Sequence, residues 1–177
     1  MKVRAMLSGF VVVLLLGAED KPTLKEFAPK EAGFSARVPG DMKETVKKLK
    51  APGGKDEVQR MYTFSPAPTT VYLIMERDMA VLANAKPATI QAALENSRKA
   101  AEESLKGKLL SEKKITLGKH PGLEFQVESA KLGVYRSRIY IADGRMYQVT
   151  VMGPKEVATS PTADEFLKSF KLVEKKE

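Results

Sequence analysis

Hydrophobic and polar residues alternate along most of the chain from residue 34 onward, in runs that glycine and proline interrupt. An apolar side chain at every second position is typical of a β-strand with one face against a core, and glycine and proline mark the turns between strands. The sequence from 69 to 75 is apolar almost throughout, which places that strand near the centre of a sheet. The pattern predicts strands at 34–38, 43–49, 58–64, 69–75, 109–117, 123–130, 134–142 and 145–152.

Turn sequences join these strands into antiparallel pairs. Pro52-Gly53-Gly54 separates 43–49 from 58–64, which predicts a hairpin with a longer loop. The last four strands follow one another closely, as in an antiparallel meander. A three-residue loop at 131–133 with a left-handed Gly133 gives a specific register. It would place Phe125 opposite Ile139, Gln126 opposite Arg138, and Glu128 opposite Arg136.

The next hairpin of the meander gives two conflicting signals. A two-residue Asp143-Gly144 turn would place Ile139 opposite Gln148, whereas the hydrophobic pattern favours Ile139 opposite Val149. An extra residue in one strand would reconcile the two, so we expect a β-bulge near this turn.

Two segments change to the helical period. Apolar and small side chains recur every three or four residues from Ile90 to Leu105, and Pro87 and Gly107 suit the start and the end of a helix. Ser160-Pro161 opens a second, short helix that runs through Phe166 and Leu167. Together these elements predict an α+β fold in which an antiparallel β-sheet (meander) is flanked by one long and one short helix.

The N-terminus has the layout of a secretory signal peptide. Lys2 and Arg4 precede an apolar stretch, which ends at the small residues Gly17 and Ala18. We therefore expect residues 1–18 to be a signal peptide and 19–177 to form a single α+β domain, with an N-terminal arm at 19–32 and a frayed tail at 174–177. Cleavage would leave no transmembrane anchor and would make the protein periplasmic or extracellular.

Composition excludes several kinds of chemistry. The chain has no cysteine and one histidine, which excludes cysteine nucleophiles, thiolate metal sites, disulfides and polyhistidine metal centres. No Gly-x-Ser-x-Gly elbow, phosphate loop or dinucleotide-binding motif is present. We interpret the single histidine, His120, as a turn residue. The sequence thus predicts a protein that is not an enzyme and has no cofactor and no metal site.

Lysine carries most of the positive charge. The formal net charge is +8, and +8 less the two charges of Lys2 and Arg4 leaves +6 after signal cleavage. The lysines are scattered, as on a solvated surface that keeps a protein soluble. The sequence lacks arginines and aromatic residues interleaved in the manner used to bind bases or phosphates, so a nucleic-acid partner is not expected. A protein partner or an envelope component is the expected partner instead.

One cluster of side chains in the meander is a candidate surface for partner binding. Aromatic and arginine side chains are frequent in protein interfaces. An alternative is that Glu124 and Glu128 pair with the two arginines and give them a structural role. The predicted face consists of Tyr135, Arg136, Arg138, Tyr140 and Tyr147.

Four motifs resemble those of PsbP-like proteins, small exported proteins related in fold to the extrinsic subunit of photosystem II. They are the Phe-x-x-x-x-Pro-Gly opening (34–40), Gly-x-x-Pro-Gly-x-Glu-Phe (118–125), Arg-x-Tyr-x-x-x-Gly-Arg-x-Tyr (138–147) and Phe-Leu-x-Ser-Phe (166–170). The resemblance spans about residues 24–173. It implies an α+β fold with an antiparallel sheet flanked by helices, and a non-enzymatic accessory role. It carries over no metal ligand and no partner-binding residue.

The function expected from the sequence is that of an exported, non-enzymatic binding or accessory protein of the cell envelope, with a PsbP-like fold. The alternative is a carrier of a small apolar or anionic ligand. Such a ligand would lie in a groove between the Ile90–Leu105 helix and the sheet.

Overall fold

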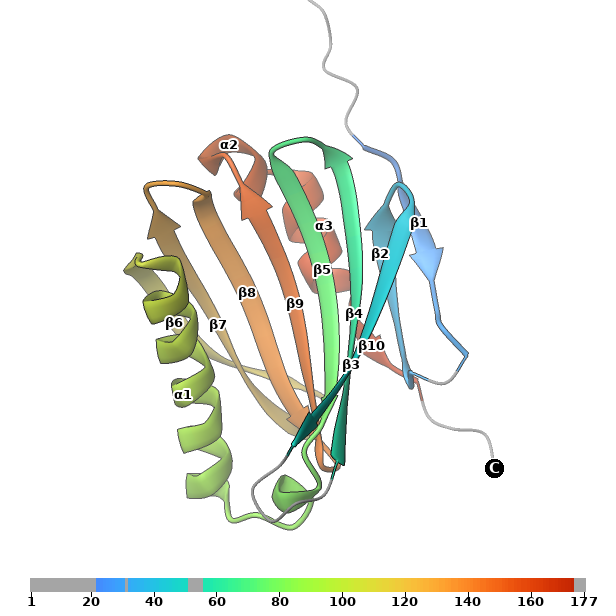
Figure 1. Cartoon of the computed structure of the whole chain (residues 1–177), viewed down its shortest axis with the longest axis vertical. Helices are drawn as coiled ribbons and strands as arrows, with labels where there is room; N and C mark the ends of the chain where they lie inside the picture. Colours follow the sequence, from blue (N-terminus) through green and yellow to red (C-terminus); the bar gives the residue numbers. More distant parts are fainter. Residues whose placement is uncertain (1–21, 31, 51–55, 174–177) are drawn as a thin grey trace, which may run out of the picture.

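The centre of the molecule is a seven-stranded antiparallel sheet (Figure 1). A computed structural model describes residues 22–30, 32–50 and 56–173. The strand order is β3-β4-β5-β9-β8-β7-β6, so β5 lies inside the sheet as predicted. The strands are β3 (Met42–Lys50), β4 (Asp56–Ala67), β5 (Thr70–Asp78), β6 (Lys108–Leu117), β7 (His120–Ser129), β8 (Gly133–Ala142) and β9 (Arg145–Gly153).

Other elements cover both faces of this sheet (Figure 1). The long helix α1 (Pro87–Leu105) packs on β7 and β8 on one face. The short helices α2 (Lys155–Ala158) and α3 (Pro161–Ser169) lie on the opposite face. A three-stranded sheet, in the order β1-β2-β10, lies on the same side as α3; its strands are β1 (Leu24–Phe27), β2 (Phe34–Pro39) and β10 (Lys171–Leu172). The predicted α+β fold is confirmed.

Successive side chains of a strand point to opposite faces, which produces two separate cores. Leu94 of α1 is fully buried against Leu123, Phe125 and Ile139 of the sheet. The core on the other side is larger and is rich in aromatic residues. It includes Phe34, Tyr62, Phe64, Tyr72, Tyr140, Tyr147, Phe166 and Phe170.

The ends of the helices agree only in part with the ends predicted from the sequence. Ser160 caps α3 as predicted, because its hydroxyl accepts a hydrogen bond from the Ala163 N–H at 3.2 Å. The long helix stops at Leu105, since Lys106 takes the left-handed conformation at φ 47°. Gly107 has a different role from the predicted helix stop. A Cβ atom at that position would lie 2.4 Å from Cγ1 of Val127, so the glycine allows the chain to pass close to β7.

The β7–β8 register differs from the predicted one by two residues. Gly133 is left-handed as expected, at φ 76°, but it pairs with Ser129 and leaves residues 130–132 as the loop. Glu124 therefore lies opposite Arg138, Gln126 opposite Arg136, and Phe125 opposite Ser137. A shift of two residues keeps every side chain on its predicted face, so the hydrophobic pattern alone could not detect it.

The predicted bulge between β8 and β9 is wrong. Ile139 lies opposite Gln148 in a regular ladder, as the Asp143-Gly144 turn requires. Both turn residues have positive φ, 48° and 74°, as a tight two-residue turn requires. Ile139 faces α1 while Val149 belongs to the aromatic core. Both faces of these strands are apolar, so the pattern does not fix their register.

The N-terminal arm contains strand β1, which pairs with β2. Phe27 anchors it, with ring centroids 5.2 Å from Tyr62 and 5.4 Å from Phe64. The predicted signal peptide at 1–18 and the tail at 174–177 lie outside the described residues. No helix in the described ranges has the length and apolarity needed to cross a membrane.

Candidate functional site

The five side chains predicted to form a binding face do not share one exposed surface. Tyr135 points to the α1 side of the sheet, with its ring 6.0 Å from that of Phe125. Tyr140 and Tyr147 are buried in the aromatic core at 3% and 5% exposure, and Tyr140 stacks on Phe170. Helix α3 and the chain after it cover this part of the sheet. The prediction that these three tyrosines form an exposed binding face is therefore wrong, because their side chains pack in the two cores.

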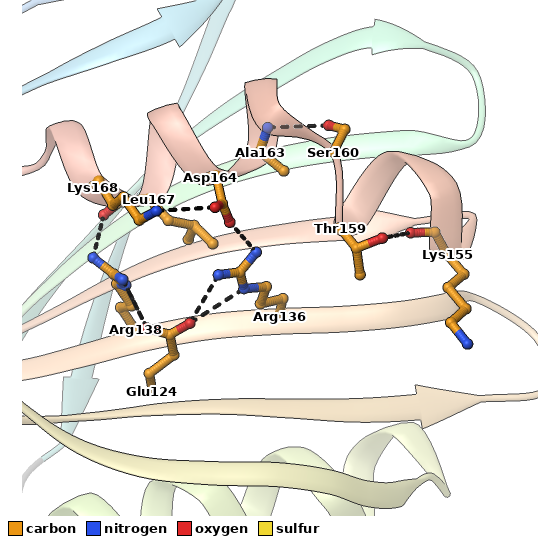
Figure 2. Close-up of polar contacts among 10 residues, drawn as sticks. All are labelled: Glu124, Arg136, Arg138, Lys155, Thr159, Ser160, Ala163, Asp164, Leu167 and Lys168. Carbon is orange, nitrogen blue, oxygen red and sulfur yellow. Dashed lines mark hydrogen bonds and ion pairs between the residues drawn. The ribbon is translucent and has the colours of Figure 1, made fainter.

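The two arginines of that face hold α3 against the sheet (Figure 2). Glu124 accepts hydrogen bonds from both Arg136 and Arg138, each at 2.9 Å. Arg136 also pairs with Asp164 of α3, which in turn pairs with Lys168 at 3.0 Å. The alternative structural role is therefore confirmed for Glu124. Glu128 is exposed opposite Val134 and makes no ion pair with a described residue.

The electrostatics of this cluster favour the charged carboxylates. Burial raises the pKa of Glu124, but hydrogen bonds from Arg136 and Arg138 and their charges outweigh it, so the pKa is lowered. The hydrogen bond from Lys168 is the main cause that lowers the pKa of Asp164. Each carboxylate is paired with two cationic side chains within the cluster, so neither carboxylate is free to bind a ligand.

A second charged cluster surrounds Glu76, which is only 2% exposed. Arg60 approaches its carboxylate to 3.2 Å and Arg145 to 3.4 Å, and Arg145 also pairs with Asp78 at 3.0 Å. Burial raises the pKa of Glu76, and Arg145 opposes that effect. Burial, followed by the charge of Glu76, raises the pKa of Tyr62 to about 12. Arg145 connects this buried cluster to the surface, where it lines a cleft.

That cleft, with a volume of about 1220 Å³, lies at one end of the sheet. The β6–β7 turn and the β8–β9 turn lie at this same end, since one hairpin separates them along the chain. His120 and Asp143 link the two turns, with Nε2 and Oδ2 3.8 Å apart. Gly33 and the β10 segment complete the walls. The lining residues are Gly33, Leu117, Gly118, Lys119, His120, Ala142, Asp143, Arg145, Tyr147, Lys171, Leu172 and Val173.

The lining of this cleft combines positive charge with apolar surface. Lys119 and Lys171 are exposed on two different walls, and neither forms an ion pair with an acidic side chain in the described part of the chain. Leu117, Ala142 and Leu172 supply the apolar part. The sequence could reveal that both tight turns share one end of the sheet. It could not reveal that residues 33 and 171–173 meet them there.

A smaller pocket of about 560 Å³ lies between β2 and α3. Arg37 and Glu165, which line it, pair with each other. Its remaining charged residues are Glu26, Lys168 and Lys171. Lys168 also pairs with Asp164, which leaves one acidic residue, Glu26, and one basic residue, Lys171, without an ion pair among the described residues, so this pocket shows no preference for a charged ligand.

The groove expected for a small-ligand carrier is filled by side chains. Leu94, Leu123, Phe125 and Ile139 meet between α1 and the sheet and are all fully buried. A ligand in that position would have to displace them. Among the described residues, no group of three or more His, Cys, Asp or Glu is arranged to hold a metal ion.

The sequence matches no protein-family model and no curated protein. The structure is similar to the solution structure of cyanobacterial PsbP (CyanoP) from Synechocystis sp. PCC 6803, with a TM-score of 0.58 and 9% identity. The alignment covers 88% of this chain and 96% of that one. A crystal structure from Pseudomonas aeruginosa, PA94, a protein of unknown function and putative regulator, aligns with a TM-score of 0.38 and 13% identity over 77% of this chain and 86% of that one, a similarity too weak to bear on the fold. The chain therefore has a PsbP-like fold.

Proposed function

We propose that this protein is a non-enzymatic binding or accessory protein that acts outside the cytoplasm and holds a partner in the cleft beside β10. The observation that carries the proposal is the cleft itself, a large opening at the end of a well-packed sheet, with two lysines that pair with no acidic side chain among the described residues. The PsbP-like fold supports an accessory role, and the signal-peptide pattern of residues 1–18 supports export.

Export is tested by fractionating cells that express the full chain and measuring the mass of the purified protein. We expect the mature protein in the periplasm or the medium, beginning at Glu19. A protein that keeps Met1–Ala18 and stays in the cytoplasm would overturn this part of the proposal.

Partner binding through the cleft is tested by photo-cross-linking in cells. A photoreactive phenylalanine replaces Lys119 in the cleft wall, and in a control protein it replaces Val46, which is 54% exposed on the edge strand β3. We expect a covalent adduct with one partner from position 119 and none with that partner from position 46. Equal adducts from both positions, or none from either, would contradict a role for the cleft.

A further inference from the structure

The structure also gives the chemistry of the partner. We infer that the cleft accepts an extended, acidic segment of a partner protein, with carboxylates beside Lys119 and Lys171 and apolar side chains against Leu117 and Leu172. This inference rests on the proposed function and makes it more specific. Charge, size and an open strand edge each support it.

Charge is the first argument. Among the described residues, the cationic Lys119, Arg145 and Lys171 and the imidazole of His120 line the cleft, against one acidic side chain, Asp143. Arg145 is already paired with Asp78 and Glu76, so the two lysines supply the unbalanced charge. Because they lie on different walls, a ligand with carboxylates spaced along its length can reach both. A positive surface of this kind attracts and orients an acidic partner.

Size favours a chain over a small molecule. At about 1220 Å³ the cleft exceeds the range of about 300–1,000 Å³ that is common for small-ligand pockets. Both apolar and charged side chains line the cleft. This combination fits a peptide in which acidic and apolar residues alternate, because successive side chains of an extended chain point in opposite directions.

The edge of β10 offers backbone hydrogen bonds. β10 pairs with β2 on one side, and no strand in the described part of the chain pairs with its other side. Lys171 and Leu172 of β10 line the cleft. An extended peptide can add to such an edge through its main chain while side-chain contacts give specificity.

Nucleic acid fits the same surface less well. Proteins that bind single strands stack the bases on exposed aromatic rings. Tyr147 is the one Phe, Tyr or Trp among the described residues that line the cleft; it is 5% exposed and packs in the aromatic core. The lysines would attract phosphates, but the described cleft offers bases no exposed ring.

Fluorescence anisotropy with short labelled peptides tests the inference on the purified protein. The probe alternates Glu and Val, and the matched neutral probe alternates Gln and Val. We expect the acidic probe to bind and the neutral one not to bind. We also expect the Lys119→Glu, Lys171→Glu double variant to bind the acidic probe about tenfold more weakly or worse, since two favourable charges become unfavourable.

The control is a double variant with the same change of charge elsewhere. Lys43→Glu, Lys47→Glu alters two exposed residues of the edge strand β3, which is not part of the cleft lining. We expect its affinity to stay close to that of the unchanged protein. Thermal melting confirms that both double variants fold, and NMR of the complex should shift the amides of Lys119 and Leu172.

Several results would overturn the inference. Equal weakening in both double variants would show a general charge effect, and equal binding of the Gln probe would show that carboxylates do not matter. Failure of the acidic probe to bind, while anionic lipid vesicles or a single-stranded oligonucleotide bind through the same lysines, would assign another partner class. A cross-link from position 119 without peptide binding would leave the proposed function in place and remove only the acidic segment.

Discussion

At the scale of single residues, Glu124 is the carboxylate on which the contact between α3 and the sheet depends. It is 16% exposed and accepts hydrogen bonds from both Arg136 and Arg138. Glu124→Gln keeps the shape of the side chain but leaves two arginines facing a neutral amide. We expect the free energy of unfolding at neutral pH to fall by about 2 kcal/mol, measured by urea denaturation.

Glu128→Gln is the matched control, because Glu128 lies four residues further along β7 and is exposed opposite Val134. Its free energy of unfolding should change by about 0.5 kcal/mol or less. Similar losses in the two variants would contradict a special role for the Glu124 cluster.

The same residue should affect the response to acid. The pKa of Glu124 in the folded protein lies below its ordinary value of 4.5, since the hydrogen bonds from the arginines outweigh the opposing effect of burial. As pH falls, the unfolded chain takes up this proton first, so the stabilisation is complete above about pH 5 and is lost below it. Asp164 acts in the same direction, whereas the raised pKa of Glu76 acts against it.

We therefore expect Glu124→Gln to lose less stability on acidification than the unchanged protein. The measurement is a series of urea titrations from neutral pH to about pH 3. Parallel stability curves for the two proteins would show that Glu124 does not carry this dependence.

At the scale of elements, Gly133 shows how a turn is fixed by a close approach as well as by its backbone angle. Gly133 and Gly40 have similar positive φ values of 76° and 70°. A Cβ atom at 133 would lie 2.3 Å from the carbonyl oxygen of Gly153, whereas at 40 it would meet nothing within 4 Å. The left-handed conformation destabilises both alanine variants, but only in Gly133→Ala would the new Cβ atom also force the backbone at Gly153 to move.

We expect Gly40→Ala to lower the free energy of unfolding by about 1 kcal/mol and Gly133→Ala by about 2–4 kcal/mol. Chemical denaturation of the two variants side by side gives the comparison. Equal losses would mean that the approach of Gly153 to β8 is looser than the structure shows.

The Ser160 cap gives a test on α3 alone. Its hydroxyl satisfies the Ala163 N–H, so Ser160→Ala should lower the free energy of unfolding by about 1 kcal/mol. Ser104→Ala on the exposed side of α1 is the control, and it should leave the free energy unchanged or slightly raised, because alanine favours helices. A loss of the same size at Ser104 would contradict the capping role.

Elements with a clear local period were predictable, and those that depend on distant partners were not. The helix from Pro87 and the meander strands follow from side-chain spacing and turn residues. β1 has four residues and is a strand because β2 pairs with it, and the four-residue α2 is too short to show a period. The bulge prediction failed because Ile139 and Val149 belong to different cores. The sequence alone does not show which elements cover each face of the sheet.

At the scale of the whole molecule, the candidate site could not be predicted for the same reason, because it depends on segments that are distant in the sequence. Arg136, Arg138 and Tyr140 lie on β8, whose sequence gives no sign that α3 folds back over it. The cleft, in turn, brings Gly33 and Lys171 next to two hairpin turns. The sequence could locate the turns and the lysines, but only the complete fold places them around one opening.

Burial of the tyrosines gives a test of the whole fold. The chain has five, and desolvation by burial is the main cause that raises the pKa of each of them, that of Tyr62 to about 12; they are Tyr62, Tyr72, Tyr135, Tyr140 and Tyr147. The folded protein thus holds phenol protons that the unfolded chain releases near pH 10. Stability contributed by these groups is complete below about pH 10 and is lost as pH rises toward the folded-state pKa values.

Tyrosinate absorbance should therefore stay low in the native protein somewhat above pH 10 and then rise steeply as alkaline unfolding exposes the rings together. In concentrated urea the same rise should be centred near pH 10, which provides the reference. Circular dichroism followed in parallel should change with the absorbance. A native protein in which tyrosines ionise near pH 10 before any loss of structure would contradict the packing of the two cores, since a ring that ionises at its ordinary pKa is in contact with water.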